Sequence, residues 1–157
     1  METIIFTYEN AVATVKLNRP EKRNAVNRQM TEELSKVLRT LKEDEHVKSL
    51  ILTGEGEEAF CAGGDLNELH GDLTEVEAYS LLSPMRDVLY ELATLPIPTL
   101  AWLNGDARGG GCELASACDV RYGRMKSDYG FIQGRLGIVP GWGEEHYSRN
   151  GWGLWKR

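Results

Sequence analysis

Three features of the sequence predict an α/β fold. Apolar residues recur at helical spacing in two long stretches, short apolar runs rich in β-branched residues lie between them, and glycine-rich turns follow two of these runs. The expected order is hairpin, helix, strand, helix, strand, helix, strand, which is typical of layered α/β proteins. A chain of 157 residues has room for one domain with a real core.

The first expected elements are a hairpin and a helix. Thr3–Tyr8 and Ala11–Leu17 are β-rich runs, and Glu9 and Asn10 between them suit a tight turn. A helix is expected over Asn27–Lys42, with Asn27 as N-cap because its side chain can accept a hydrogen bond from the first turn. The apolar face of this helix would consist of Met30, Leu34, Val37, Leu38 and Leu41.

The middle of the chain predicts a strand, a loop and a second helix. Lys48–Thr53 has the composition of a buried strand, and a polar loop then leads to Phe60–Asp65. The second helix ends before the prolines of Leu95–Pro98. Within it, Ser83 and Pro84 mark either a kink or a new start with Ser83 as cap. The periodic apolar residues are Tyr79, Leu82, Val88, Leu89 and Leu92.

The last expected elements surround a run of three glycines. A strand over Thr99–Asn104 precedes Gly109–Gly111, and a short apolar helix follows over Cys112–Ala117. Asp119–Tyr122 has the pattern of another strand.

Composition and charge argue against several classes of protein. The formal net charge of −6 disfavours general nucleic-acid binding, which needs a basic face. No run approaches the roughly 20 apolar residues that span a bilayer, and no secretory signal is apparent at Met1. Three cysteines without a C-x-x-C pair favour a reducing cytoplasm over a disulfide framework or a zinc site. An anionic ligand would need a local cluster of positive charge.

Two glycine-rich turns could hold an anion. Glycine lets a ligand approach the backbone closely, and amides at a helix N-terminus carry positive partial charge. If Gly63–Gly64 and Gly109–Gly111 face each other, two N–H groups could hold one oxygen as an oxyanion hole. The simpler alternative is that these glycines only make tight turns. A dinucleotide fingerprint is excluded because Leu114 stands where its third glycine is needed.

Four sequence blocks carry a resemblance to a known family. They are N-R-P-E-K-R-N-A over Asn18–Ala25, A-F-C-A-G-G-D-L over Ala59–Leu66, the glycine-rich segment Asn104–Ala115, and G-I-V-P-G-W-G over Gly137–Gly143. In this order and spacing they resemble the crotonase (enoyl-CoA hydratase/isomerase) superfamily. The resemblance implies a ClpP/crotonase-like spiral of ββα units and a coenzyme A thioester as substrate, with no separate cofactor and no metal. It also implies a homotrimer or hexamer.

The resemblance implies a role for each matching position. The amides of Gly64 and Gly110 would form the oxyanion hole for the thioester carbonyl, and Glu113 would be the acid/base carboxylate. The residues implied to border coenzyme A are Lys22 and Arg23, with their charges near phosphate, then Ala25, and finally Ala62, Asp65 and Leu66 beside adenine and pantetheine.

Thioester chemistry gives these roles a physical basis. Polarising the carbonyl makes the enolate accessible, and one positioned acid or base typically contributes about 10²–10⁴ in rate. Burial of Glu113 in the apolar segment that follows it would raise its pKa toward the working range. A solvated place in a first helical turn is the alternative for this residue.

One position departs from the family pattern. Gln133 stands where family hydratases carry a second glutamate, and an amide cannot give or take a proton at neutral pH. A single-carboxylate enzyme is therefore expected, and isomerisation, hydration and decarboxylation all stay open.

The chain is expected to divide into a crotonase-like core, residues 1–143, and an atypical tail, residues 144–157, with the family's C-terminal helical part missing. The tail lacks a helical apolar period, which suggests an out-of-frame origin. The expected function is that of an acyl-CoA thioester enzyme. The alternatives are an impaired remnant that at most binds coenzyme A, and an interaction module that docks through the tail tryptophans.

Overall fold

The computed structural model describes residues 1–68, 74–136 and 140–142. The expected tail, residues 144–157, and the segments 137–139 and 143 of the last family block lie outside the described residues. The prediction of an out-of-frame tail therefore stays a prediction.

The chain begins with the predicted hairpin. Strand β1 (Ile4–Glu9) pairs antiparallel with β2 (Val12–Leu17). The turn lies at Asn10 and Ala11, one residue later than expected, and both residues have positive φ (51° and 66°). Two central residues with positive φ suit the right-handed twist of a hairpin.

Two sheets are built from alternating strands. The larger has the order β1-β2-β3-β5-β7, and all of its pairs after the hairpin are parallel. Its further strands are β3 (Ser49–Gly54), β5 (Thr99–Leu103) and β7 (Val120–Gly123). The smaller sheet, with the order β4-β6-β8, consists of β4 (Ala59–Cys61), β6 (Asp106–Arg108) and β8 (Tyr129–Gly130).

Each strand of the larger sheet from β3 onward is followed by one strand of the smaller sheet. The pairs β3/β4, β5/β6 and β7/β8 thus repeat the same step, and a helix follows each of the first two. This repetition is a spiral of ββα units, and the predicted α/β fold is confirmed. Periodicity could not predict β4, β6 and β8, because strands of two or three residues are too short to show a period.

The first long helix matches its prediction closely. Helix α1 (Arg28–Glu43) is capped by Asn27, whose Oδ1 accepts a hydrogen bond from the Met30 amide at 2.9 Å. The five predicted apolar residues of this helix are all buried.

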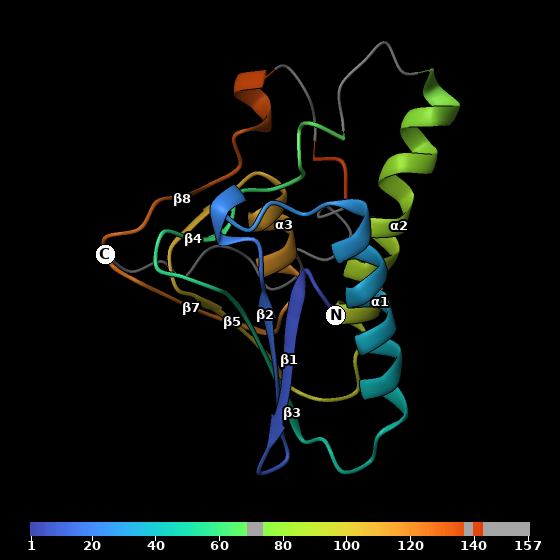
Figure 1. The fold of residues 1–157 in the computed structure, drawn as a ribbon, viewed down its shortest axis with the longest axis vertical. Coiled ribbons are helices and arrows are strands. Elements are labelled where there is room, and N and C mark those ends of the chain that lie inside the picture. The colour runs from blue at the N-terminus through green and yellow to red at the C-terminus, as the bar shows by residue number, and fades with distance from the viewer. Residues whose placement is uncertain (69–73, 137–139, 143–157) are drawn as a thin grey trace.

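The second long helix differs from its prediction. Helix α2 (Glu75–Ala93) runs through Pro84 without a break, so a new start at Ser83 is wrong. The helix begins instead at a capping box, in which Thr74 and Glu77 satisfy each other's backbone amides. Figure 1 shows α1 and α2 side by side, with α3 (Gly110–Ser116) nearer the centre of the molecule.

The core lies between α1, α2 and one face of the larger sheet. Side chains from all three elements surround a residual space of about 10 Å³, which indicates close packing. They are Val15, Leu34, Val37, Leu38, Leu50, Leu52, Val88 and Leu92, together with Leu114 of α3.

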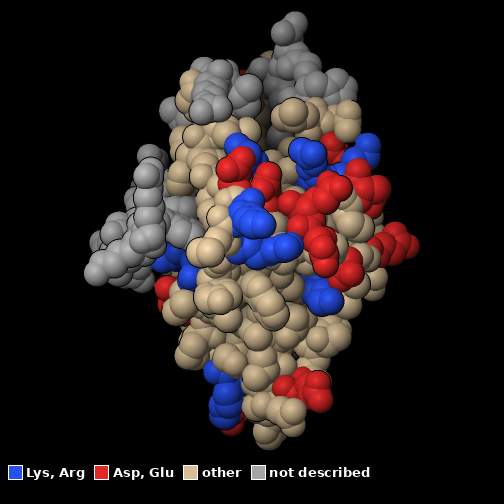
Figure 2. Space-filling view, turned by 90° about the vertical axis from the view of Figure 1, so that its left-hand side faces the viewer, with Lys and Arg blue, Asp and Glu red and all other residues tan. Residues whose placement is uncertain are grey.

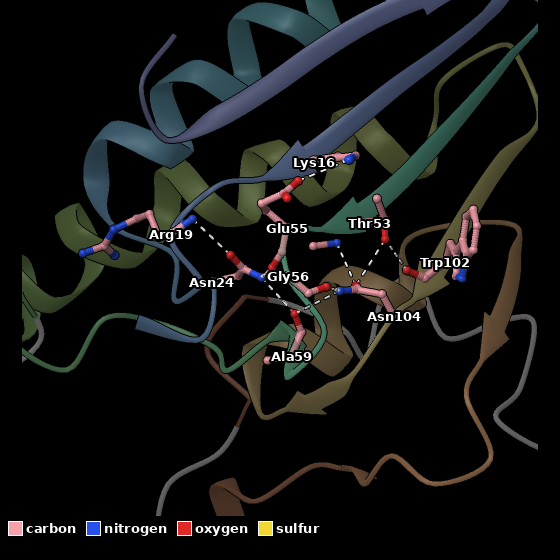
Figure 3. A network of polar contacts seen from close by, with 10 residues as sticks. Lys16, Arg19, Asn24, Thr53, Glu55, Gly56, Ala59, Trp102 and Asn104 are labelled. Carbon is pink, nitrogen blue, oxygen red and sulfur yellow. Dashed lines mark hydrogen bonds and ion pairs between the residues drawn. The ribbon is translucent and has the colours of Figure 1, made fainter. Parts of the chain in front are cut away.

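The side chains of two asparagines, the buried Asn24 and the half-buried Asn104, join the loops at the end of this sheet (Figure 3). The Asn24 amide donates to the carbonyls of Glu55 and Ala59 at 3.0 and 2.8 Å. Asn104 accepts from the Gly54 amide at 2.9 Å and donates to the Gly56 carbonyl at 2.8 Å. These bonds hold the loop between β3 and β4, and so determine where the glycine turn after β4 begins.

Candidate active site

The two glycine-rich turns pack against each other, as the sequence suggests. A Cβ on Gly111 would lie 2.1 Å from the Cys61 carbonyl oxygen, and one on Gly63 would lie 3.2 Å from the Gly110 amide nitrogen. Gly63 and Gly109 also have positive φ (98° and 50°). Side chains at these positions would push the turns apart, so glycine is required by the close approach.

The backbone N–H groups of Gly64 and Gly110 are not used by the secondary structure around them. Gly64 forms a parallel bridge with Val26, in which the Val26 amide donates to Gly63 and the Asp65 amide donates to Val26. In this pattern the Gly64 N–H points away from Val26. Gly110 opens α3, where first-turn amides have no partner within the helix. Within the described part of the chain, neither amide donates a backbone hydrogen bond.

Glu113 lies in the first turn of α3 and is almost fully buried, with 2% of its surface exposed. Its Oε1 accepts a hydrogen bond from Gln133 Nε2 at 2.9 Å. Its Oε2 accepts one from the Trp142 backbone amide, also at 2.9 Å. The alternative of a solvated Glu113 is thus wrong, because each carboxylate oxygen accepts an N–H donor instead of facing water.

The structure brings Gln133 to Glu113, although the two are 20 residues apart in sequence. Gln133 begins the 3₁₀ helix η2 (Gln133–Leu136), and it is 7% exposed. Its second polar atom, Oε1, is buried and makes no hydrogen bond with the described residues.

Sequence reasoning did not single out Trp142, which stands at the variable position of the last family block. Its ring lies so close to Gly110 that a Cβ on this glycine would be 2.3 Å from the ring. The ring is buried, and its backbone amide bonds Glu113. Trp142 therefore contacts both the first residue of α3 and the buried carboxylate, which a sequence pattern alone could not reveal.

A groove of about 590 Å³ runs from the Gly64 turn along α1 and α2 to Trp142. This volume is within the usual range of small-molecule sites. Neither Glu113 nor Gln133 lines it, so Trp142 lies between the groove and the carboxylate. Its lining includes the apolar side chains of Val26, Leu82, Pro84, Met85 and Trp142.

The predicted coenzyme A residues fall into two groups. Lys22 and Arg23 are exposed at the end of the 3₁₀ helix η1 (Pro20–Lys22), and Arg23 lies 3.7 Å from the equally exposed Glu58. Ala25 is buried and Ala62 half-buried, and the Ala62 amide donates to the Arg23 carbonyl at 3.0 Å. The structure brings these two segments together, while their contact with a ligand stays a prediction.

Asp65 and Leu66 have very different surroundings. Asp65 is buried, and Arg19 Nη2 bonds its Oδ2 at 2.8 Å. This Arg19 hydrogen bond is the main reason that the pKa of Asp65 is lowered. Leu66 is 70% exposed. Arg19 stands in the first family block, but the motif alone does not reveal that its side chain reaches Asp65.

Basic and acidic side chains are interspersed on one face of the molecule. On the face drawn in Figure 2, Lys and Arg side chains lie among Asp and Glu side chains and form no separate basic patch.

The three cysteines, Cys61, Cys112 and Cys118, are all buried. Burial raises the pKa of Cys61 to about 12, which keeps the thiol protonated and unreactive at neutral pH. The described residues contain no cluster of three or more side chains that could hold a metal ion. In the same part of the chain, no helix combines the length and the apolarity needed to cross a membrane.

Comparison with known proteins gives a consistent result. The family model for enoyl-CoA hydratase/isomerase matches residues 7–153. A short-chain-enoyl-CoA hydratase of Clostridium acetobutylicum is 36% identical over 143 residues, covering 91% of this chain and 54% of that protein. The mitochondrial methylglutaconyl-CoA hydratase of Mus musculus is 36% identical over 132 residues, covering 84% and 42%.

A solved structure agrees with these sequence matches. An enoyl-CoA hydratase from Bacillus anthracis has a TM-score of 0.85 and 37% identity, covering 90% of this chain and 55% of that one. The chain thus spans about half the length of the relatives it matches. Because sequence and fold agree over nearly all of its residues, the chain belongs to the enoyl-CoA hydratase/isomerase family.

Proposed function

We propose that this chain binds an acyl-CoA thioester and stabilises its enolate, with Glu113 as the proton carrier. The observation that carries the proposal is the buried carboxylate of Glu113, held by two N–H donors directly after the glycine turn. A carboxylate positioned in this way can remove the proton next to a polarised carbonyl.

The amides of Gly64 and Gly110 are proposed to bind the thioester oxygen. Their support is the close contact of the two glycine turns and the absence of backbone acceptors for either amide among the described residues. Negative charge develops on the oxygen as the α-proton leaves, and fixed N–H donors stabilise that charge without reorganising. One such donor typically contributes about 10²–10³ in rate.

The groove between α1 and α2 is proposed to take the acyl or pantetheine chain. It contains Gly64 at one side and the apolar surface near Trp142 at the other. Lys22 and Arg23, both exposed, are proposed to lie near the phosphates of coenzyme A. A cytoplasmic location is proposed from the three unpaired cysteines, and a trimeric or hexameric assembly from the family resemblance. Light scattering after gel filtration would test the assembly.

Calorimetric titration with coenzyme A and acetoacetyl-CoA tests the binding part of the proposal. Saturable binding that is stronger for acetoacetyl-CoA is expected, because its enolate places negative charge where the two amides point. Folded protein that binds neither ligand would contradict the proposal.

Glu113→Gln tests the proton carrier. The change keeps the size of the side chain but removes its ability to take a proton, so turnover of an enoyl-CoA panel should fall by about 10²–10⁴. Acetoacetyl-CoA affinity should change far less than turnover. Full activity of this variant on every thioester would rule Glu113 out as the acid/base.

The alternative function is binding of coenzyme A without turnover. Gln133 favours this alternative over two-carboxylate hydration, because the residue that faces Glu113 cannot exchange a proton. Saturable binding with no turnover of enoyl, hydroxyacyl or malonyl thioesters would support it.

A further inference from the structure

The side chain of Trp142 stands where the groove between α1 and α2 meets the candidate active site. The described residues that line this groove include Gly64 and Trp142 but not Glu113. The backbone amide of Trp142 nevertheless donates to Glu113 Oε2 at 2.9 Å, and the residue is only 6% exposed. Trp142 therefore belongs both to the wall of the groove and to the surroundings of the buried carboxylate.

The six-membered part of the Trp142 indole covers Gly110. A Cβ built on this glycine would lie 2.3 Å from Cζ3, 2.5 Å from Cη2 and 2.8 Å from Cε3 of the indole. Cβ atoms in proteins essentially never come this close to another heavy atom. The space beside the Gly110 Cα is therefore filled by the ring, with no room for one methyl group between them.

A thioester held by the Gly64 and Gly110 amides would bring its acyl group close to this ring. Its carbonyl oxygen would lie about 3 Å from each amide nitrogen, and the carbon next to the carbonyl is two bonds from that oxygen. The Gly110 nitrogen is bonded directly to the Cα that the indole covers. A branch on that carbon would collide with the indole, whereas an unbranched chain can continue along the groove past Val26 and Met85.

We propose that Trp142 selects acyl thioesters that are unbranched at the carbon next to the carbonyl. The inference rests on the proposed function, because the Gly110 amide is the group that places the thioester beside the ring. It narrows the substrate class from acyl-CoA thioesters in general to those with a slim reacting end. Trp142 determines specificity through its side chain, while its backbone N–H is retained by every residue except proline.

Two isomeric thioesters test the proposal on the unmodified chain. Butyryl-CoA and isobutyryl-CoA contain the same atoms and differ only in whether a methyl group branches from the carbon next to the carbonyl. Calorimetry should give an affinity for butyryl-CoA that is about tenfold higher, because one methyl or methylene group in a closely fitting apolar site typically changes selectivity by this factor or more.

Variants of Trp142 test whether its ring is the cause. Trp142→Leu removes the part of the indole that covers Gly110, so the affinity for isobutyryl-CoA should rise until the two affinities agree within about twofold. Loss of folded protein would weaken both ligands and cannot produce such a rise. Trp142→Phe keeps a smaller ring with less disturbance of the packing and should give an intermediate ratio.

Trp102→Leu is the matched control for these variants. This tryptophan is 49% exposed on β5 and does not line the groove, so its replacement should leave the ratio of the two affinities unchanged. Circular dichroism of each variant checks that it is folded.

The outcomes distinguish this inference from the function on which it rests. Equal binding of butyryl-CoA and isobutyryl-CoA by the unmodified chain would overturn the inference and leave the proposed function standing. A tenfold preference that persists in folded Trp142→Leu would overturn it as well, because another part of the site would then exclude the branch. Failure of both isomers and of acetoacetyl-CoA to bind the folded chain would overturn both.

Discussion

Single side chains at the glycine turns join segments that are distant in sequence. Arg19 Nη1 donates to the Ala25 carbonyl at 2.7 Å, and Arg19 Nη2 donates to Asp65 at 2.8 Å. Both partners are largely shielded, since the side chains of Arg19 and Asp65 are 16% and 9% exposed. The pair thus fastens the loop that follows β4 to the loop that follows β2, and the Gly64 amide lies directly beside this attachment.

Asp65→Asn should make stability less dependent on pH. The pKa of Asp65 is lowered in the folded chain, chiefly by the Arg19 hydrogen bond. Its stabilising effect is therefore fully present above the unfolded pKa of about 4 and is lost as pH falls through the folded value. The variant should lose about 2 kcal/mol of unfolding free energy at pH 7, and the difference should shrink in acid. Urea unfolding from pH 7 to pH 3 measures both.

Asp87→Asn is the control for this prediction. Its ion pair with Arg86 is exposed, so the free energy of unfolding should change by less than about 0.5 kcal/mol. An Asp65 variant with the same pH dependence as the unmodified chain would contradict the role assigned to the pair.

At the scale of elements, helix α2 shows how local signals compete. Pro84 normally disfavours a helix interior, so the sequence predicts either a kink or a new start at this point. The helix continues because buried side chains that follow Pro84, such as Met85 and Val88, anchor it to the core. Its actual start is fixed by the capping box of Thr74 and Glu77, for which the T-x-x-E spacing of these two residues is the sequence signal.

Thr74→Ala should weaken the start of α2. The Thr74 side chain bonds both the Glu77 amide and the Glu77 carboxylate, and its loss should cost about 1 kcal/mol of unfolding free energy. Hydrogen exchange should accelerate in the first turn of α2 and stay unchanged in α1. Thr40→Ala, an exposed position within α1, should be neutral or slightly stabilising because alanine is the better helix former.

At the scale of the whole molecule, the two sheets and α3 meet at the glycine turns. β4 and β6 are neighbours in the smaller sheet, and the turns that follow them place Gly63 against Gly110 and Gly111 against Cys61. A side chain at Gly63 or Gly111 would collide with the backbone of the facing turn and push the two turns apart. The site and the packing of the smaller sheet therefore depend on the same contacts.

Gly111→Ala should destabilise the whole fold. Its Cβ would lie 2.1 Å from the Cys61 carbonyl oxygen, and backbone cannot move aside as easily as a side chain. A loss of about 3 kcal/mol of unfolding free energy is expected, together with weaker binding of acetoacetyl-CoA. Gly134→Ala meets no atom within 4 Å and should change stability by less than about 0.5 kcal/mol. Thermal and urea unfolding of both variants give the comparison.

The order of the long elements and the family follow from the sequence alone. Helical spacing of apolar residues predicts α1, and the chemistry of the Asn27 side chain predicts its cap. The motif blocks predict the family, which the comparisons confirm. These signals are local, because each depends on residues within a few positions of one another. The short strands of the smaller sheet gave no such signal.

Only the tertiary structure decides what surrounds the candidate site. Gln133 and Trp142 bond Glu113 across 20 and 29 residues, and Arg19 reaches Asp65 across 46. Such contacts arise from the packing of whole elements, and no periodicity along the chain encodes them. The sequence therefore names Glu113 and Gln133, while only the folded chain shows that Gln133 donates a hydrogen bond to Glu113.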